Sequence, residues 1–263
     1  MNSDSEENKI EVGPVKPRSR GIYLLPNLLT TAGLFAGFYA IVSAINNQYE
    51  AAAVAIFIAM VLDGLDGRIA RLTHTQSDFG AEYDSLVDMV AFGLAPALVV
   101  YLWCLQSLGK VGWLVAFVYV ACAALRLARF NSQNGSSEKR FFKGLASPSA
   151  AALVAGFIWV GTDWIGADTA SEPGRFITVV GLVVTLFAAL LMVSNVLFRS
   201  FKDFDMKGRV PFVALLIVVM VFVLISIDPP IVLFAGFLIY ALSGPVGALM
   251  RRSSKRSEET GEE

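Results

Sequence analysis

Two aspartate-rich stretches, residues 63–71 and 80–88, are separated by eight residues and lie between long apolar segments. The first contains Asp63 and Asp66, and the second contains Asp84 and Asp88. An aspartate at the centre of a membrane helix costs about 2.5–3.5 kcal/mol on insertion scales, so four of them in apolar surroundings need a compensating positive charge. Oxygen ligands without histidine or cysteine partners are typical of a hard divalent cation. The four aspartates therefore predict a site for Mg²⁺ or Mn²⁺.

The residues around the first two aspartates form one face of a predicted helix. At 100° per residue, small side chains and an arginine follow the acids on that face. The small side chains leave room for a nucleotide, and the guanidinium offers a rigid fork for a diphosphate. The candidate contacts of such a ligand, including one glycine of the next helix, are Asp66, Gly67, Ala70, Arg71 and Gly80.

The second stretch forms a matching face. Gly80, Asp84 and Asp88 recur every four residues, which keeps them on one side of a helix. In an antiparallel hairpin, residues equidistant from the turn lie at equal height, so Asp63 should face Asp88 and Asp66 should lie level with Asp84. The carboxylates then converge, as needed to hold two metal ions around a phosphoryl group. An ion pair that merely ties two helices together would need one acid, and there are four.

The segments that carry these residues are predicted to cross a membrane. With 56% hydrophobic and 16% charged residues and a mean hydropathy of +0.63, the chain is too apolar for a soluble domain. Runs long enough for a ~30 Å hydrocarbon core recur at residues 27–46, 50–66, 86–106, 111–130, 146–165, 175–197, 210–227 and 230–250. The predicted fold is all-α, a polytopic membrane helical bundle of about eight transmembrane helices.

The distribution of lysine and arginine predicts the orientation. If the N-terminus is cytoplasmic, 19 of the 21 basic residues fall on the cytoplasmic side, leaving Lys110 and Arg175 outside. The positive-inside rule favours this arrangement. We therefore expect both termini and the aspartate hairpin to face the cytoplasm. The polar stretches 1–20 and 251–263 are predicted to be disordered cytoplasmic tails.

The aspartate pattern resembles the signature of the CDP-alcohol phosphotransferase family. It reads Asp-Gly-x₂-Asp-Gly-x₂-Ala-Arg-x₈-Gly-x₃-Asp-x₃-Asp from Asp63 to Asp88, and every defined position matches. The resemblance implies that an alcohol attacks the lipid-bearing phosphorus of a CDP-activated donor and releases CMP. It also implies two divalent metals held by the aspartates, with Asp88 as catalytic base. Members of this family are often homodimers, so we expect self-association.

Further stretches are similar to the integral-membrane phosphatidylserine synthases of this family. They comprise residues 83–88, 92–97, 124–131, 142–145, 191–195 and 199–202. Ala91 and Ala146 depart from the serine and proline usual there. The resemblance implies a bacterial cytoplasmic membrane protein with CDP-diacylglycerol and L-serine as substrates. It gives a six-helix phosphotransferase domain at residues 21–205, followed by two additional transmembrane helices within residues 206–250.

Polar residues near the ends of the fourth and sixth apolar runs are candidates for binding the acceptor or the phosphates. They are Arg126, Arg129, Asn131, Arg199 and Lys202. A guanidinium fork matches a serine carboxylate. The alternative is that such side chains anchor helix ends at the membrane interface, and this is least favoured for Arg126, which lies deeper in its helix.

Other functions are compatible with aspartates in membrane helices. Within the family, the acceptor could be glycerol phosphate, inositol phosphate or choline, because the metal site does not distinguish them. An aspartate-lined cation transporter often has related halves and interrupted helices, and an intramembrane prenyltransferase carries two acid-rich motifs. This chain has one aspartate hairpin. Membrane lipids and the two substrates are therefore the expected partners, and nucleic acid is not.

Overall fold

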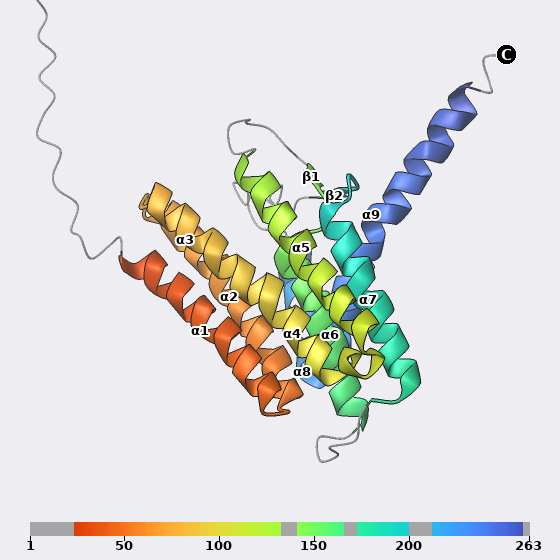
Figure 1. Cartoon of the computed structure of the whole chain (residues 1–263). Helices are drawn as coiled ribbons and strands as arrows, with labels where there is room; N and C mark the ends of the chain where they lie inside the picture. Colours follow the sequence, from red (N-terminus) through yellow and green to blue (C-terminus); the bar gives the residue numbers. More distant parts are fainter. Residues whose placement is uncertain (1–23, 133–140, 166–172, 200–211, 260–263) are drawn as a thin grey trace, which may run out of the picture.

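The computed structural model describes residues 24–132, 141–165, 173–199 and 212–259 (Figure 1). The predicted N-terminal tail and Lys202 lie outside these ranges. Within them the chain is helical apart from its connecting turns and one short pair of strands.

The helices follow the predicted apolar runs closely. They are α1 (Leu24–Ile45), α2 (Tyr49–Leu72), α3 (Asp78–Asp88), the π-helix η2 (Met89–Leu94), α4 (Ala95–Trp103), the 3₁₀-helix η3 (Leu105–Leu108), α5 (Lys110–Ser132), α6 (Ser147–Ile165), α7 (Arg175–Val193), α8 (Phe212–Ile227) and α9 (Pro229–Glu259). Because α3, η2 and α4 follow one another without a break, they correspond to the third predicted run. The all-α prediction is confirmed.

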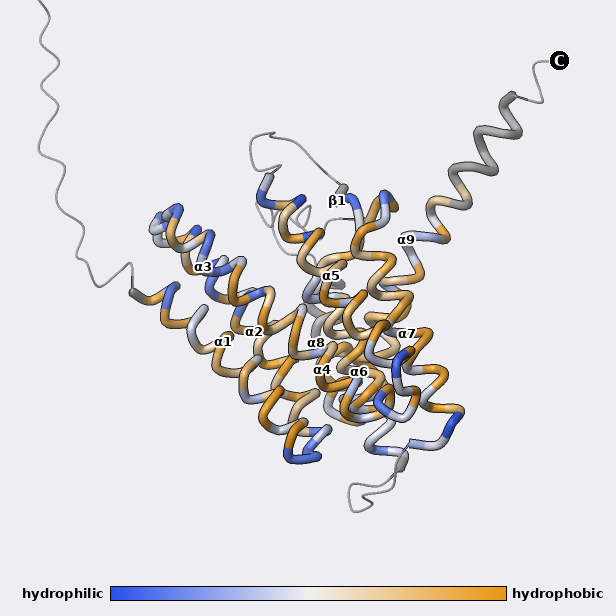
Figure 2. The backbone as a smooth tube through the Cα atoms, in the orientation of Figure 1, coloured by the Kyte–Doolittle hydropathy of each residue, from blue (hydrophilic) through white to orange (hydrophobic). Residues whose placement is uncertain are grey.

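Five helical segments of the described chain have the length and hydropathy of a membrane span. They are Leu25–Ile45, Asp78–Trp103, Lys110–Ser132, Arg175–Val193 and Pro229–Ala248. Helix α2 also follows a predicted run but carries two acids and two arginines in its last turns, and α8 has only 16 residues. Apolar residues extend along the helices, with hydrophilic residues mainly near their ends (Figure 2). The chain is a polytopic helical membrane protein.

Helix α6 lies at the centre of the bundle, where it contacts α2, α4, α7 and α9. Residues 150–155 of α6 are buried and include four alanines. Alanines of α1 and α2 are also fully buried, among them Ala40, Ala52 and Ala59. Small side chains let helix backbones approach closely, which favours packing where the surrounding lipid gives little hydrophobic driving force.

A short strand pair, not predicted from the sequence, connects two loops. β1 (Phe141–Lys143) pairs antiparallel with β2 (Leu197–Arg199). Gly144 follows β1 with a φ of 82°, and its N–H donates to the Val196 carbonyl at 2.8 Å. A Cβ at this glycine would collide with the Met192 carbonyl oxygen. The pair therefore holds the segment before α6 against the segment after α7.

Helix α9 continues beyond the end predicted from the sequence. We expected a disordered tail from residue 251, but the helix extends to Glu259. Residues 251–259 contain no glycine or proline, and arginine, lysine and glutamate are good helix formers. The charged residues from 251 onwards therefore indicate where the apolar segment ends, but the helix continues through them.

Candidate active site

The turn between α2 and α3 fixes the hairpin that carries the aspartates. The Thr75 N–H donates to the Ala70 carbonyl at 3.0 Å, which closes the turn after α2. Ser77 caps α3, since its hydroxyl oxygen accepts a hydrogen bond from the Gly80 N–H at 3.0 Å. Such a cap satisfies a backbone donor that the first helical turn leaves unpaired. Local contacts within eleven residues thus set the two helices antiparallel.

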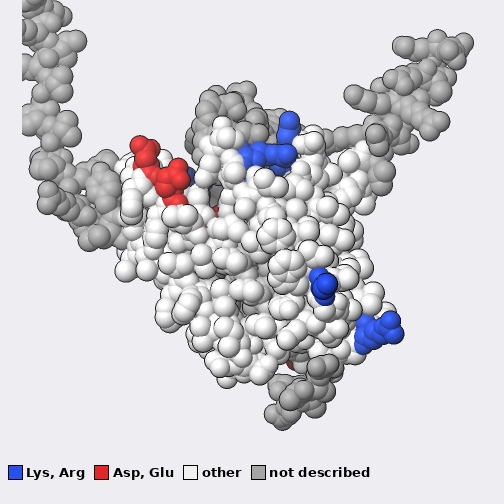
Figure 3. Space-filling model, in the orientation of Figure 1, with Lys and Arg blue, Asp and Glu red and all other residues white. Residues whose placement is uncertain are grey.

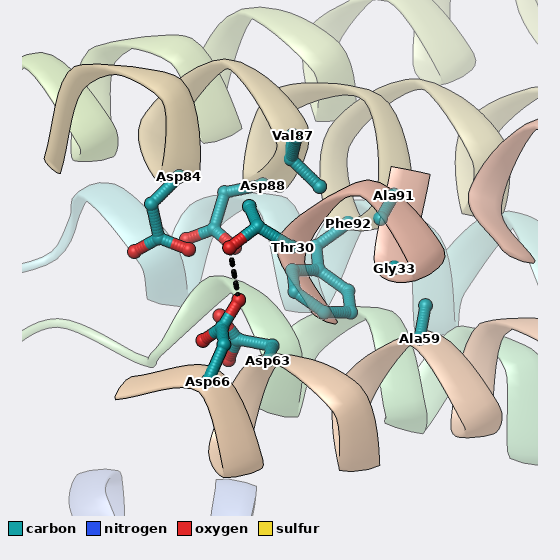
Figure 4. A pocket seen from close by; sticks show the side chains of 10 residues that line it. All are labelled: Thr30, Gly33, Ala59, Asp63, Asp66, Asp84, Val87, Asp88, Ala91 and Phe92. Atoms are coloured by element: carbon teal, nitrogen blue, oxygen red, sulfur yellow. Dashed lines mark hydrogen bonds between the residues drawn. The ribbon is translucent and has the colours of Figure 1, made fainter. Parts of the chain in front are cut away.

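All four aspartates line one small cavity of about 10 Å³ (Figure 4). Carboxylate oxygens of Asp63, Asp66 and Asp84 lie within 4.8 Å of one another. Asp88 interacts with Asp63 through their side chains. The structure therefore brings together the pairs expected from the symmetry of the hairpin, with Asp63 opposite Asp88 and Asp84 beside Asp66.

Helix α1 contributes a further residue that the aspartate pattern does not include. Thr30, itself buried, donates a hydrogen bond from its hydroxyl to Asp66 Oδ2 at 2.6 Å. Asp66 is only 4% exposed, and this bond fixes the orientation of its carboxylate. The sequence feature that could have indicated this contact is the presence of polar Asn27 and Thr30 within the first apolar run.

The acid cluster fits a divalent cation. Its donors are all carboxylate oxygens, as hard cations prefer, and Asp84 is repelled by both Asp63 and Asp66. Arg126 attracts Asp88 but belongs to another helix, α5. The residues that would hold a divalent metal ion are Asp63, Asp66 and Asp84.

A second cavity of about 380 Å³ adjoins the acids and is large enough for a small ligand. Its walls come from the start of α1, the end of α2, the turn, the start of α3 and Phe130 of α5. All five residues predicted to contact a nucleotide diphosphate line it, namely Asp66, Gly67, Ala70, Arg71 and Gly80. The Arg71 Nε donates to the Gly67 carbonyl at 2.8 Å, which holds the guanidinium along the helix. The structure thus places these residues around one cavity.

The residues predicted to bind the acceptor whose side chains are described do not line the nucleotide cavity. Arg126 donates from Nη1 to the Ser147 hydroxyl oxygen at 2.7 Å and interacts electrostatically with Asp88. The Asn131 amide donates to the Ser85 hydroxyl oxygen at 3.0 Å. Ser85 lies between Asp84 and Asp88 in the sequence.

Of the remaining acceptor candidates, Arg129 contacts the end of α7, and the side chains of Arg199 and Lys202 lie outside the described part of the chain. Arg129 donates to the Val193 carbonyl at 3.4 Å, at the end of α7. The Arg199 backbone belongs to β2. Of the basic candidates with described side chains, Arg126 is therefore the one that interacts with the aspartates.

Comparison with known proteins identifies the family. Residues 23–187 match the family described as CDP-alcohol phosphatidyltransferase, which is more than half of the 263-residue chain. The chain belongs to the CDP-alcohol phosphatidyltransferase family. This finding confirms the resemblance based on the aspartate pattern and does not support the transporter and prenyltransferase alternatives.

Several curated relatives share one name, CDP-diacylglycerol–serine O-phosphatidyltransferase. The Helicobacter pylori strain J99 protein is 36% identical over 210 residues, covering 80% of this chain and 84% of that relative. The Mycobacterium tuberculosis H37Rv protein is 42% identical over 151 residues, covering 54% of this chain and 52% of that relative. The Methanocaldococcus jannaschii protein is 30% identical over 184 residues, covering 70% of this chain and 78% of that relative.

Proposed function

We propose that the chain transfers the phosphatidyl group of CDP-diacylglycerol to the hydroxyl of L-serine, giving phosphatidylserine and CMP. The observation that carries this proposal is the convergence of four aspartates beside a cavity lined by every predicted nucleotide contact. The shared name of the relatives supports serine as the acceptor. The direct test is release of CMP from CDP-diacylglycerol when L-serine is added to the purified protein.

The donor is proposed to place its cytidine diphosphate in the 380 Å³ cavity, with Arg71 beside the phosphates and Gly67 leaving space for them. Asp63, Asp66, Asp84 and Asp88 would hold Mg²⁺ or Mn²⁺. When bound, the metal supplies positive charge to the phosphoryl oxygens in the transition state. Thr30 keeps the Asp66 carboxylate oriented.

Asp88 is proposed as the general base. It accepts the proton of the serine hydroxyl while the serine oxygen forms a bond to the lipid-bearing phosphorus. The bond between that phosphorus and the bridging oxygen of the diphosphate breaks, and CMP leaves with the electron pair. Arg126, next to Asp88, is proposed to bind the serine carboxylate. The other predicted contacts of the acceptor or the phosphates are Arg129, Asn131, Arg199 and Lys202.

Filling the cavity at Gly67 should weaken donor binding. A Cβ at Gly67 meets no atom within 4 Å, so Gly67→Leu should fold, with its side chain projecting into the cavity. We expect the KM for CDP-diacylglycerol to rise about tenfold, since a displaced contact worth ~1.4 kcal/mol gives that factor. Steady-state kinetics at saturating serine measures it.

The matched control is Gly236→Leu. Gly236 also lies within a helix, and a Cβ there also meets no atom within 4 Å, but it is on α9 and outside the cavity. This variant should keep the parental KM. An unchanged KM in Gly67→Leu would place the nucleotide elsewhere.

The site is proposed to face the cytoplasm of a bacterial membrane, as the basic residues predict. Basic side chains of the described chain are seen both beside the outer end of α5 and near the opposite end of the bundle, while acidic side chains are seen at the outer end of α3 (Figure 3). Lys110 and Arg175, predicted to be outside, begin α5 and α7, whereas Arg126 and Arg129 lie near the other end of α5. A homodimer remains a proposal.

Cysteine labelling tests this orientation. The native Cys104 and Cys122 are buried, so a new exposed cysteine can be followed separately. In intact cells, a membrane-impermeant maleimide should label Lys110→Cys and should label Asp78→Cys only after permeabilisation. The reverse pattern would place the aspartate hairpin outside, away from cytoplasmic serine.

A further inference from the structure

The helix that carries Asp84 and Asp88 changes its geometry directly after Asp88. The next six residues, Met89–Leu94, form a π-helix before α4 begins at Ala95. The Ala95 N–H donates to the Val90 carbonyl, five residues back and not four. Single π turns are rare and occur frequently at functional sites. Residues Ala91 and Phe92 of this turn line the cavity that the four aspartates share.

The sequence gives a physical reason for the π turn. In an α-helix, the Phe92 carbonyl would accept a hydrogen bond from the N–H of residue 96, but residue 96 is a proline and has none. A proline ring also clashes with the carbonyl four residues earlier. Tyr119 of α5 supplies a donor instead, since its hydroxyl donates to the Phe92 carbonyl at 3.2 Å. Tyr119 is fully buried, so this hydroxyl is committed to the protein interior.

Helix α1 holds the other side of the same turn. A Cβ at Gly37 would lie 2.8 Å from the Ala91 Cα, so the two backbones approach as closely as glycine permits. The turn is thus held between α1 and α5. Beyond it, α4 is anchored by buried side chains that include Val99, Val100 and Trp103.

We propose that Tyr119 and Pro96 are positioning residues for Asp88, because together they keep the π turn that follows it. Without the π turn, α3 would rotate by about 100° relative to α4, the angle of one residue in an α-helix. Since α4 is packed in the core, α3 would take up the rotation and carry Asp88 away from Asp63. This inference rests on the proposed role of Asp88 in catalysis.

The first test is Tyr119→Phe, which removes the hydroxyl but keeps the ring. We expect kcat to fall by about tenfold to hundredfold, the scale on which small misplacements of reacting groups act. The KM for CDP-diacylglycerol should stay within about twofold, because Tyr119 does not line the nucleotide cavity. Amide hydrogen exchange in residues 89–97 should accelerate. Tyr39→Phe, at an exposed tyrosine of α1, should change none of these quantities.

The second test is Pro96→Ala, which restores the missing N–H and removes the ring. We expect its thermal midpoint to match or exceed that of the parent, because proline within a helix is unfavourable, while kcat falls as in Tyr119→Phe. If Pro96 served only the stability of the fold, Pro96→Ala would keep the parental kcat. If Tyr119→Phe fails to fold, Pro96→Ala decides the question.

The outcomes separate this inference from the proposed catalytic role. Parental kcat in both Tyr119→Phe and Pro96→Ala, together with an inactive Asp88→Asn, would overturn the inference and leave the role of Asp88 standing. An active Asp88→Asn would overturn both. The result we expect is loss of kcat in both variants, with a thermal midpoint of Pro96→Ala at or above that of the parent and faster exchange in Tyr119→Phe.

Discussion

Replacing Asp88 by asparagine is expected to lower kcat by about 10³-fold, within the range that a lost general base accounts for. The change keeps the size of the side chain but removes the proton acceptor and one full charge of the metal site. Because Asp63 and Asp84 repel a charge on Asp88, the variant should unfold at the same or a higher temperature than the parent when divalent cation is absent. Phosphatidyl transfer and thermal unfolding measure the two effects.

Adding Mg²⁺ or Mn²⁺ should reverse that order of stability. A ligand that binds only the folded state stabilises it, so the parent should gain more in thermal midpoint than Asp88→Asn. Asp78→Asn is the control, since Asp78 is an exposed acid on the same helix, outside both cavities. Substantial transfer activity in Asp88→Asn would remove Asp88 from the chemistry.

Replacing Arg126 by lysine is expected to raise the KM for L-serine about tenfold or more, because an ammonium cannot form the paired hydrogen bonds of a guanidinium with a carboxylate. The KM for CDP-diacylglycerol should change by less than about threefold, since Arg126 does not line the nucleotide cavity. Initial rates with each substrate varied in turn distinguish the two constants.

Arg175→Lys serves as the control, because Arg175 begins α7, at the end of that helix opposite to Val193. It should leave both KM values unchanged. An equal loss for both substrates in Arg126→Lys would assign Arg126 to the donor phosphates or to the packing of α5 against Ser147.

The aspartate pairing could be predicted from the sequence because it depends on one hairpin. Helical periodicity and distance from the turn place Asp63 opposite Asp88 without knowledge of the remaining chain. The cavity contacts followed for the same reason, since four of the five belong to one face of α2 and the fifth, Gly80, to the first turns of α3.

The rest depends on contacts between distant segments, which local patterns do not encode. Thr30 reaches Asp66 across 36 residues, and Arg126 reaches Ser147 across 21. The partner of Phe92 is Tyr119, on another helix. The strands β1 and β2 have three residues each, too few for an alternating pattern to stand out. These contacts arise from how the helices pack and not from the periodicity of any one of them.

The most direct test of the central claim is a head-group assay on the purified full-length protein in lipid vesicles. The vesicles contain CDP-diacylglycerol and Mg²⁺ or Mn²⁺, and L-serine, glycerol phosphate, inositol phosphate or choline is added separately. We predict that CMP and a new phospholipid form with L-serine, and that Asp88→Asn forms both about 10³-fold more slowly. Turnover of another alcohol without any use of L-serine would contradict the proposed acceptor, while CMP release by Asp88→Asn at the parental rate would contradict the proposed site.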